Sequence, residues 1–188
     1  MRHLLLVAIL MIATVASANK FGTKLSSGWS VAGDMPDKYE MSSDDNGVCH
    51  IQSTAKRIKG FGTLMRTAVV EKYNGQRVRM TGYMRSENVD GWASFWFRVD
   101  PKADNDNKGN STAFDNMYYR SIKGTTEWKE YEIVLDVDEN TANIAFGALL
   151  NGTGEIWFKD VHFETVTNDV PVTDMKVAKN DNGVEFND

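Results

Sequence analysis

Hydrophobic and polar residues alternate along most of this chain, and clusters of Gly, Asn and Asp separate the alternating segments. Helical periodicity is nearly absent after residues 1–18. Alternation with a period of two, interrupted by turn residues, predicts an all-β fold, a two-sheet antiparallel β-sandwich of about eight or nine strands. Ten segments have strand character, the first of them short: residues 28–33, 38–44, 47–55, 61–70, 77–87, 91–100, 113–124, 128–137, 142–150 and 155–166.

The segment "GWASFWFRVD", residues 91–100, carries bulky side chains on both of its faces. Successive strand residues point to opposite sides of a sheet, so the two faces can be separated by parity. One face holds Ala93, Phe95, Phe97 and Val99, and the other holds Trp92, Ser94, Trp96 and Arg98. A half-buried strand needs one apolar face, so the second face indicates either a binding surface or a further layer of the core.

The segment "ANIAFGALL", residues 142–150, is almost continuously apolar. Such a run predicts a central strand that is buried on both faces. We therefore expect Ile144, Phe146 and Leu149 to belong to the core.

The N-terminus has the features of a secretory signal peptide. Arg2 and His3 precede an apolar run from Leu4 to Val15, and small residues up to Ala18 offer a cleavage site. We expect a signal peptide at residues 1–18, a β-sandwich domain at 19–166 and a polar, flexible tail at 167–188. No later apolar run is long enough to span a membrane. The expected location is secreted or periplasmic, and retention of the apolar run as an anchor is the alternative.

Charge and cysteine content narrow the classes of partner. The net charge is −5, which argues against nucleic acid and anionic lipid as partners. Cys49 is the single cysteine, so no intrachain disulfide can form. We expect Cys49 to be a buried, inert thiol, because its neighbour His50 would point to the opposite face of a strand.

Residues 61–166 resemble a bacterial family of galactose-binding-like jelly rolls. The resemblance is carried by "GWASFWFRVD", "AFDNMYYRSIKGTTEWKEYEIVLDV" and "NIAFGALLNGTGEIWFKDVHFETV". Members of that family occur as exported stand-alone proteins and also fused to AraC-type regulators. The resemblance implies a jelly-roll fold like that of many carbohydrate-binding modules, but it implies no defined activity. The sequence shows no helix-turn-helix segment of its own.

We predict a ligand-binding face for a carbohydrate or a similar polyhydroxylated molecule. If residues 77–87 and 91–100 form neighbouring strands, aromatic and charged side chains share one surface, on which sugars can stack and form hydrogen bonds. The predicted ligand-binding residues are Tyr83, Arg85, Trp92, Trp96, Arg98, Asp115, Asn116, Tyr119 and Arg120. A salt bridge from Arg98 to Asp100 or Asp115 is an equally acceptable role for that guanidinium.

Metal sites are weakly indicated, and we predict no cofactor. Asp104, Asp106, Gly109 and Asp115 match positions 1, 3, 6 and 12 of a calcium loop, but Lys108 stands where a fifth-position oxygen ligand belongs. The family resemblance implies that a structural calcium can lie elsewhere, near the first and last strands, where Asp160 is the residue to check. A zinc site is not favoured, because ligand spacing is absent.

Catalysis is not indicated either, because the sequence contains none of the common nucleophile, phosphate-loop or zinc-protease motifs. We therefore favour a non-catalytic exported binding module. The alternatives are a structural or protein-interaction module of the cell envelope and a glycoside-active hydrolase or lyase.

Overall fold

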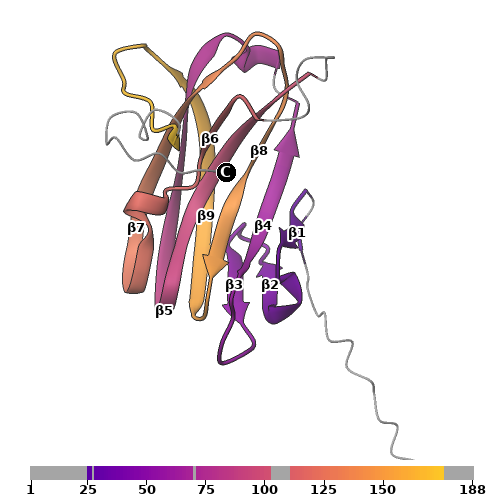
Figure 1. Cartoon of the computed structure of the whole chain (residues 1–188), viewed down its shortest axis with the longest axis vertical. Coiled ribbons are helices and arrows are strands. Elements are labelled where there is room, and N and C mark those ends of the chain that lie inside the picture. The colour runs from indigo at the N-terminus through magenta and orange to yellow at the C-terminus, as the bar shows by residue number, and fades with distance from the viewer. Residues whose placement is uncertain (1–24, 27, 70, 103–110, 176–188) are drawn as a thin grey trace, which may run out of the picture.

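Two antiparallel β-sheets face each other in a computed structural model, which describes residues 25–26, 28–69, 71–102 and 111–175 (Figure 1). Every strand pairing in this part of the chain is antiparallel, and short 3₁₀ turns interrupt the strands. The strands are β1 (Ser30–Gly33), β2 (Tyr39–Ser43), β3 (Cys49–Ser53), β4 (Phe61–Ala68), β5 (Gln76–Pro101), β6 (Ala113–Asp115), β7 (Ile122–Val137), β8 (Thr141–Asn151) and β9 (Glu155–Val166). This arrangement confirms the predicted β-sandwich.

The long strand β5 belongs to both sheets (Figure 1). Its first half, up to Glu87, lies between β7 and β9. Its second half, from Trp92 onward, lies beside β8 and pairs with β6 near its end. One sheet therefore has the order β2-β3-β9-β5-β7, and the other has the order β1-β4-β8-β5-β6. Residues 77–87 and 91–100, which we expected to form neighbouring strands, are instead successive halves of one strand.

Local backbone geometry lets β5 pass from one sheet to the other. Asn88 has a positive φ of 52°, and the register between β5 and β7 shifts on either side of Val89. Irregularities of this kind bend a strand and increase its twist. At Gly91 the backbone comes so close to the Asn151 carbonyl oxygen that a Cβ would collide with it. The glycine is therefore required where β5 enters the second sheet.

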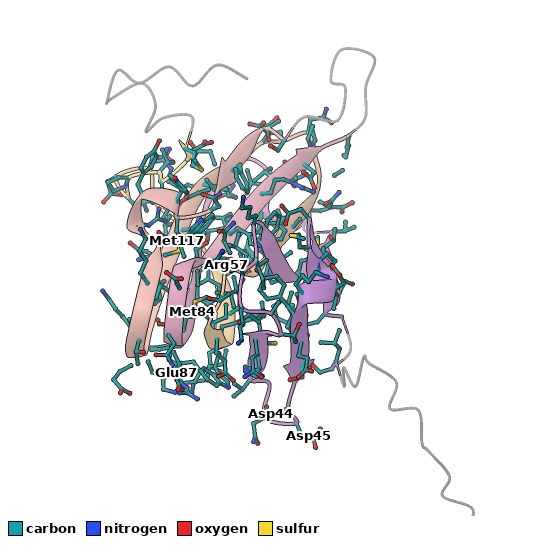
Figure 2. All side chains as sticks on the ribbon, turned by 60° about the horizontal axis from the view of Figure 1, so that its bottom comes forward. Asp44, Asp45, Arg57, Met84, Glu87 and Met117 are labelled. Atoms are coloured by element: carbon teal, nitrogen blue, oxygen red, sulfur yellow. The ribbon has the colours of Figure 1, made fainter. Side chains whose placement is uncertain are left out.

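The main core lies between the two sheets, where the side chains are densely packed (Figure 2). Ala93, Phe95, Phe97 and Val99 all lie in it, as the parity of the opening segment predicts. The Phe95 ring reaches across to the other half of the same strand, where a Cβ on Gly82 would lie 2.8 Å from it. The inner faces of the two halves of β5 thus contact each other through the core.

Strand β8 is the central strand that its apolar run predicts. It lies between β4 and β5, and every residue from Ile144 to Leu150 is buried. Ile144 and Phe146 enter the main core, whereas Leu149 belongs to a smaller apolar cluster on the other face of the sheet.

The predicted strand 113–124 is divided in the structure. Strand β6 ends at Asp115, a 3₁₀ turn covers Tyr118–Arg120, and β7 begins at Ile122. The Asp115 carboxylate accepts a hydrogen bond from the Met117 amide at 2.7 Å, and Met117 has a φ of 54°. A side chain that bonds the backbone two residues ahead favours a turn over a continuing strand.

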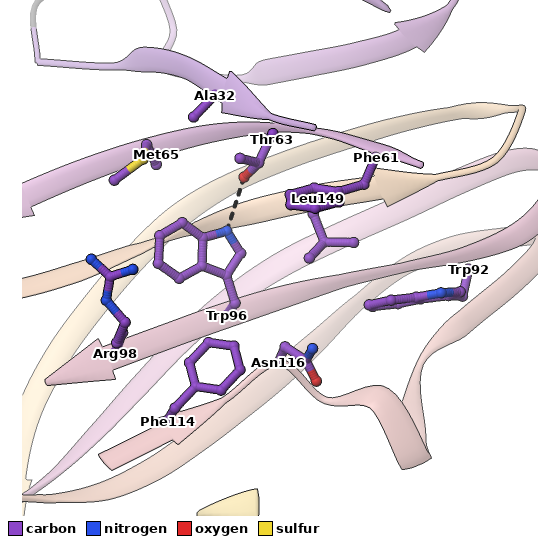
Figure 3. A pocket seen from close by; sticks show the side chains of 11 residues that line it. Ala32, Phe61, Thr63, Met65, Trp92, Trp96, Arg98, Phe114, Asn116 and Leu149 are labelled. Atoms are coloured by element: carbon purple, nitrogen blue, oxygen red, sulfur yellow. Dashed lines mark hydrogen bonds between the residues drawn. The ribbon is translucent and has the colours of Figure 1, made fainter. Parts of the chain in front are cut away.

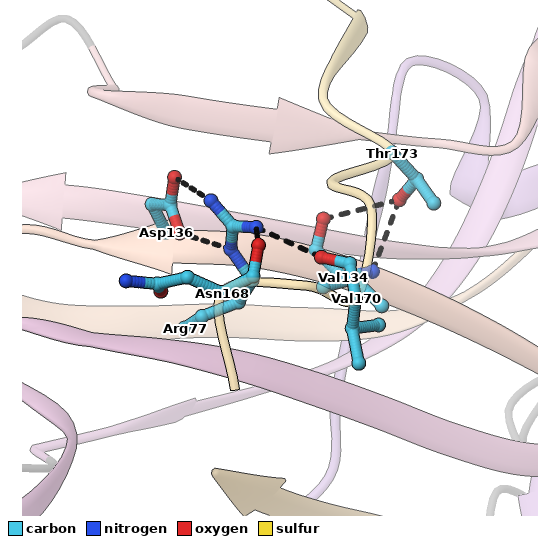
Figure 4. A network of polar contacts seen from close by, with 6 residues as sticks. All are labelled: Arg77, Val134, Asp136, Asn168, Val170 and Thr173. Carbon is cyan, nitrogen blue, oxygen red and sulfur yellow. Dashed lines mark hydrogen bonds and ion pairs between the residues drawn. The ribbon is translucent and has the colours of Figure 1, made fainter. Parts of the chain in front are cut away.

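The start of the predicted flexible tail is fastened to the sandwich (Figure 4). Arg77 donates from Nη1 to the carbonyl oxygens of Asn168 and Val170, both at 2.8 Å, and also pairs with Asp136. Thr173 exchanges hydrogen bonds with the backbone of Val134 on β7. The expected boundary at residue 167 is therefore too early, because the chain is held at least to Thr173, and residues 176–188 lie outside the described part.

The predicted signal peptide, residues 1–18, also lies outside the described residues. Within the described part, no helix has the length and the apolar character that a membrane crossing requires.

We predict that Phe146→Ala lowers the free energy of unfolding by about 3–5 kcal/mol, because it leaves a cavity between the sheets. Phe146 packs edge-on against Trp29 and Phe163 in this region. Chemical denaturation measures the change, and Val31→Ala, at a side chain that is 44% exposed, is the control. A loss below about 1 kcal/mol for Phe146→Ala would contradict the described core.

Candidate functional site

A second apolar cluster lies on the outer face of the β1-β4-β8-β5-β6 sheet. Along each strand, the members of this cluster alternate with residues that point into the main core. Its members are Phe61, Met65, Trp92, Trp96, Phe114, Ala145 and Leu149. Small residues occupy the middle of this face, since Gly147 lies between Met65 and Trp96, and Ser94 lies beside Leu149. Bulky side chains around a small-residue centre form a depression, which we call the outer trough.

The outer trough is a pocket of about 320 Å³ (Figure 3). That volume is at the lower end of the range for small-molecule sites in proteins. The residues that line it are Ala32, Gly33, Phe61, Thr63, Met65, Trp92, Trp96, Arg98, Phe114, Asn116 and Leu149. They come from β1, β4, β8, β5, β6 and the turn after β6.

The Trp96 indole forms part of the floor of the trough. Its Nε1–H donates to the Thr63 hydroxyl at 2.9 Å, and that hydroxyl donates to the Ala148 carbonyl oxygen at 2.7 Å (Figure 3). Trp96 is only 7% exposed, so the expectation of two solvent-presented indoles does not hold for it. The hydrogen bond fixes the ring orientation, because a buried indole N–H without a partner would be costly.

Trp92 is the more accessible indole and lies at one end of the trough (Figure 3). The Tyr118 ring meets it edge-to-face with 5.4 Å between centroids, and Tyr119 meets Tyr118 at the same separation. Tyr118 and Tyr119 are 52% and 62% exposed. These three rings form an exposed aromatic rim beside the apolar floor.

Arg98 and Asn116 supply polar groups on the β5–β6 side of the trough. Arg98 donates two hydrogen bonds to the Asp100 carboxylate, at 2.7 and 3.0 Å, which agrees with one of the two salt bridges considered for it. A guanidinium carries five N–H donors, so three of them have no hydrogen-bond partner among the described residues. Asn116 accepts a bond from the Tyr118 amide, which leaves its side-chain NH₂ group to donate.

Asp115 and Arg120 do not line the trough, although we predicted both as ligand-binding residues. Asp115 is 1% exposed and bonds to Arg120 at 2.7 Å and to the Met117 amide. Arg120 also donates to the Glu132 carbonyl oxygen at 2.8 Å. Both side chains are thus engaged in fixing the turn that presents Asn116 and the tyrosines.

Tyr83 and Arg85 lie on the outer face of the opposite sheet, because they belong to the first half of β5. The Arg85 guanidinium stacks on the Trp157 indole at 3.6 Å and also faces Trp128 at 5.8 Å. Trp157 in turn stacks on His50 with 4.9 Å between ring centroids. The structure therefore separates Tyr83 and Arg85 from the outer trough and places Arg85 in a cross-strand ladder of cations and aromatic rings.

The described residues contain no group of three or more His, Cys, Asp or Glu side chains arranged to hold a metal ion. Asp104, Asp106 and Gly109 of the considered calcium loop lie outside the described part. Asp160 has a largely exposed side chain at a positive φ of 54° and pairs with Lys159. No metal ligand set can be built around it from its described neighbours.

Cys49 is buried in the main core, as expected for an inert thiol. Burial raises the pKa of this thiol to about 12, so it stays protonated at physiological pH. His50 points to the outer face, where it bonds to Glu155 at 2.6 Å. The thiol and the imidazole therefore lie on opposite faces of β3.

Strand β4 provides a wall of the trough that we did not predict from the sequence. Phe61, Thr63 and Met65 alternate with the core residue Leu64. The segment "FGTLM" therefore has bulky side chains on both faces, the same signal that drew attention to residues 91–100. Phe114 and Leu149 were assigned to strands without a surface role, because their register with β5 cannot be obtained from periodicity.

No known family model matches the chain. The sequence is 38% identical over 161 residues to the uncharacterized HTH-type transcriptional regulator YbfP of Bacillus subtilis (strain 168). The alignment covers 82% of this chain and 53% of the relative, so the chain spans about half the length of that protein.

Several solved structures share the architecture. The phage CBA120 tailspike protein 4 domain matches with a TM-score of 0.53 at 11% identity, covering 74% of this chain and 20% of that chain. The CBM22-1–GH10 modules of a Clostridium thermocellum xylanase match with a TM-score of 0.51 at 14% identity, covering 78% of this chain and 27% of that chain. A carbohydrate-binding module of family 4 matches with a TM-score of 0.50 at 10% identity, covering 78% of this chain and 94% of that chain. At these identities the likeness concerns the fold alone, and the chain has the jelly-roll β-sandwich fold that carbohydrate-binding modules use.

Proposed function

We propose that this chain is a non-catalytic carbohydrate-binding module whose ligand lies in the outer trough. The observation that carries the proposal is the position of Trp92, a partly exposed indole at the end of a concave apolar surface, with Arg98 and Asn116 along the same side. Recognition of a sugar ring requires an aromatic ring on which the sugar stacks and a few hydrogen-bond donors directed at its hydroxyl groups.

The roles of the residues follow from their contacts. A pyranose ring lies with its C–H face on Trp92, while Tyr118, perpendicular to that indole, and Tyr119 add aromatic contacts at the rim of the trough. The free N–H groups of Arg98 and the amide of Asn116 donate to hydroxyl oxygens of the sugar. Trp96 supports the ring from below rather than stacking on it, because its indole is nearly covered.

The structural neighbours support this ligand class. One was determined with its xylanase modules bound to xylohexaose, and another is described as a xylan-binding domain and matches with a TM-score of 0.50 at 8% identity over 74% of this chain and 87% of its own. The 38% identical relative is named a transcriptional regulator. In such a protein, a domain of this kind would supply ligand recognition, and the acidic charge of the present chain does not favour contact with nucleic acid.

A second candidate function is protein contact through the opposite sheet. Tyr83 and Trp128 are each 38% exposed on that face, and Arg85 faces Trp128. Exposed aromatic side chains on an outer sheet face are typical of interaction surfaces. A Trp128 variant therefore serves as the matched control for the first candidate.

We propose that the protein is exported through a signal peptide at residues 1–18. The basic start, the apolar run and the small residues before Asn19 support this placement. N-terminal sequencing of the protein recovered from the periplasm or medium of its host should begin at Asn19. Recovery of the uncleaved chain in the cytoplasm would contradict export.

We predict that Trp92→Ala weakens binding to whichever glycan the wild type retains on a glycan array by at least about tenfold, or about 1.4 kcal/mol. The ring is the exposed platform, and its loss removes the stacking contact. Trp128→Ala, on the opposite sheet, should bind like the wild type. Absence of any bound glycan for the wild type, or an equal loss for both variants, would remove the proposal.

A further inference from the structure

The two long walls of the outer trough differ in chemistry. The β5–β6 side presents Arg98 and Asn116. The β4–β8 side presents Phe61, Met65 and Leu149, and the one hydroxyl there, that of Thr63, is occupied. Thr63 accepts from the Trp96 indole and donates to the Ala148 carbonyl oxygen. No described side chain on that wall is therefore left to serve a hydroxyl group of a ligand.

An unmodified sugar fits this asymmetry poorly. A pyranose carries hydroxyl groups around its whole perimeter, and a hydroxyl placed against Met65 and Leu149 would lose its water without gaining a side-chain partner, because the Ser94 hydroxyl beside Leu149 is completely buried. Polar groups buried without a hydrogen bond are unfavourable. A ligand that fills the whole trough must be polar along one side and apolar along the other.

We infer that the trough takes a saccharide that carries an apolar acyl substituent, with the acyl group against the β4–β8 wall. This inference rests on the proposed carbohydrate-binding function and specifies its ligand. The sugar ring lies toward Trp92, where Asn116 and Arg98 reach its hydroxyls, and the acyl carbons contact Phe61, Met65 and Leu149. The ester or amide group that joins the two parts stays on the β5–β6 side, where Arg98 and Asn116 can donate to its carbonyl oxygen, so only the acyl carbons are placed against the apolar wall.

The volume of the trough is consistent with this division. One pocket of about 320 Å³ is lined both by Trp92 and by the apolar side chains of Phe61, Met65 and Leu149. Burying one additional carbon group in an apolar pocket changes affinity by about 10–200-fold. The acyl group is therefore expected to dominate discrimination among ligands that share a sugar backbone.

The test uses matched pairs of oligosaccharides of xylan, glucomannan and chitin type, each in an acetylated form and after removal of its acetyl groups. Isothermal titration with the wild-type protein should give at least about tenfold tighter binding for the acetylated member of the pair that binds. Triacetin supplies acetyl esters without a sugar ring and should bind far more weakly than that saccharide.

Two variants on β4 locate the effect. Met65→Gln replaces an apolar lining side chain by a polar one of similar length, and it should reduce the preference for the acetylated form at least fivefold, chiefly by weakening binding of the acetylated saccharide. Thr67→Gln, on the same face of β4 but outside the trough, should leave the preference unchanged. Thermal melting of both variants checks that they are folded.

The outcomes separate the two proposals. Equal affinity for both members of every pair that binds overturns the acyl inference and leaves carbohydrate binding standing. An unchanged preference in Met65→Gln also overturns it. Binding of triacetin as tightly as the acetylated saccharide, or no binding of any saccharide, counts against carbohydrate binding itself.

Discussion

The sharing of one strand between two sheets determines where the candidate site can lie. Because β5 is continuous from Gln76 to Pro101, its side chains alternate between core and exterior in both layers. The bend near Asn88 and the close approach at Gly91 set the point at which it changes partners. After that point, Trp92, Trp96 and Arg98 lie on the exterior face of the β1-β4-β8-β5-β6 sheet. Before that point, the outward side chains of β5 lie on the exterior face of the opposite sheet.

The aromatic residues are arranged differently on the two exterior faces. On the β4-β8-β5 face, Trp96 is paired with the small residue Gly147 and bonds to Thr63, and the surface there is hollow and mostly apolar. On the opposite face, Arg85 fills the space between aromatic neighbours, with Trp157 at 3.6 Å, so that surface is closed by its own contacts. A hollow with fixed rings is prepared for a ligand without rearrangement, which lowers the cost of binding. This difference is why we propose carbohydrate binding at the first face.

Much of the fold was predictable from the sequence, whereas the composition of the site was only partly so. Alternation placed Phe95 and Phe97 in the core, and the apolar run of 142–150 located the central strand. Parity alone also separates Trp92 and Trp96 from the core side of their strand. What periodicity cannot give is register and strand pairing, which bring residues distant in sequence together. For that reason Tyr83 was grouped with Trp96, although β5 carries them to opposite sides, and Met65 was overlooked.

The central claim is that the exterior face of the second half of β5, and no other face, receives a glycan. Two-dimensional ¹⁵N NMR of the tryptophan indole N–H signals tests it directly, because each indole reports on its own sheet face. The titrated ligand is the glycan that the array identifies. The account predicts that the Trp92 signal shifts progressively while those of Trp128 and Trp157 stay in place. Shifts confined to Trp128 and Trp157, with Trp92 unaffected, would contradict it.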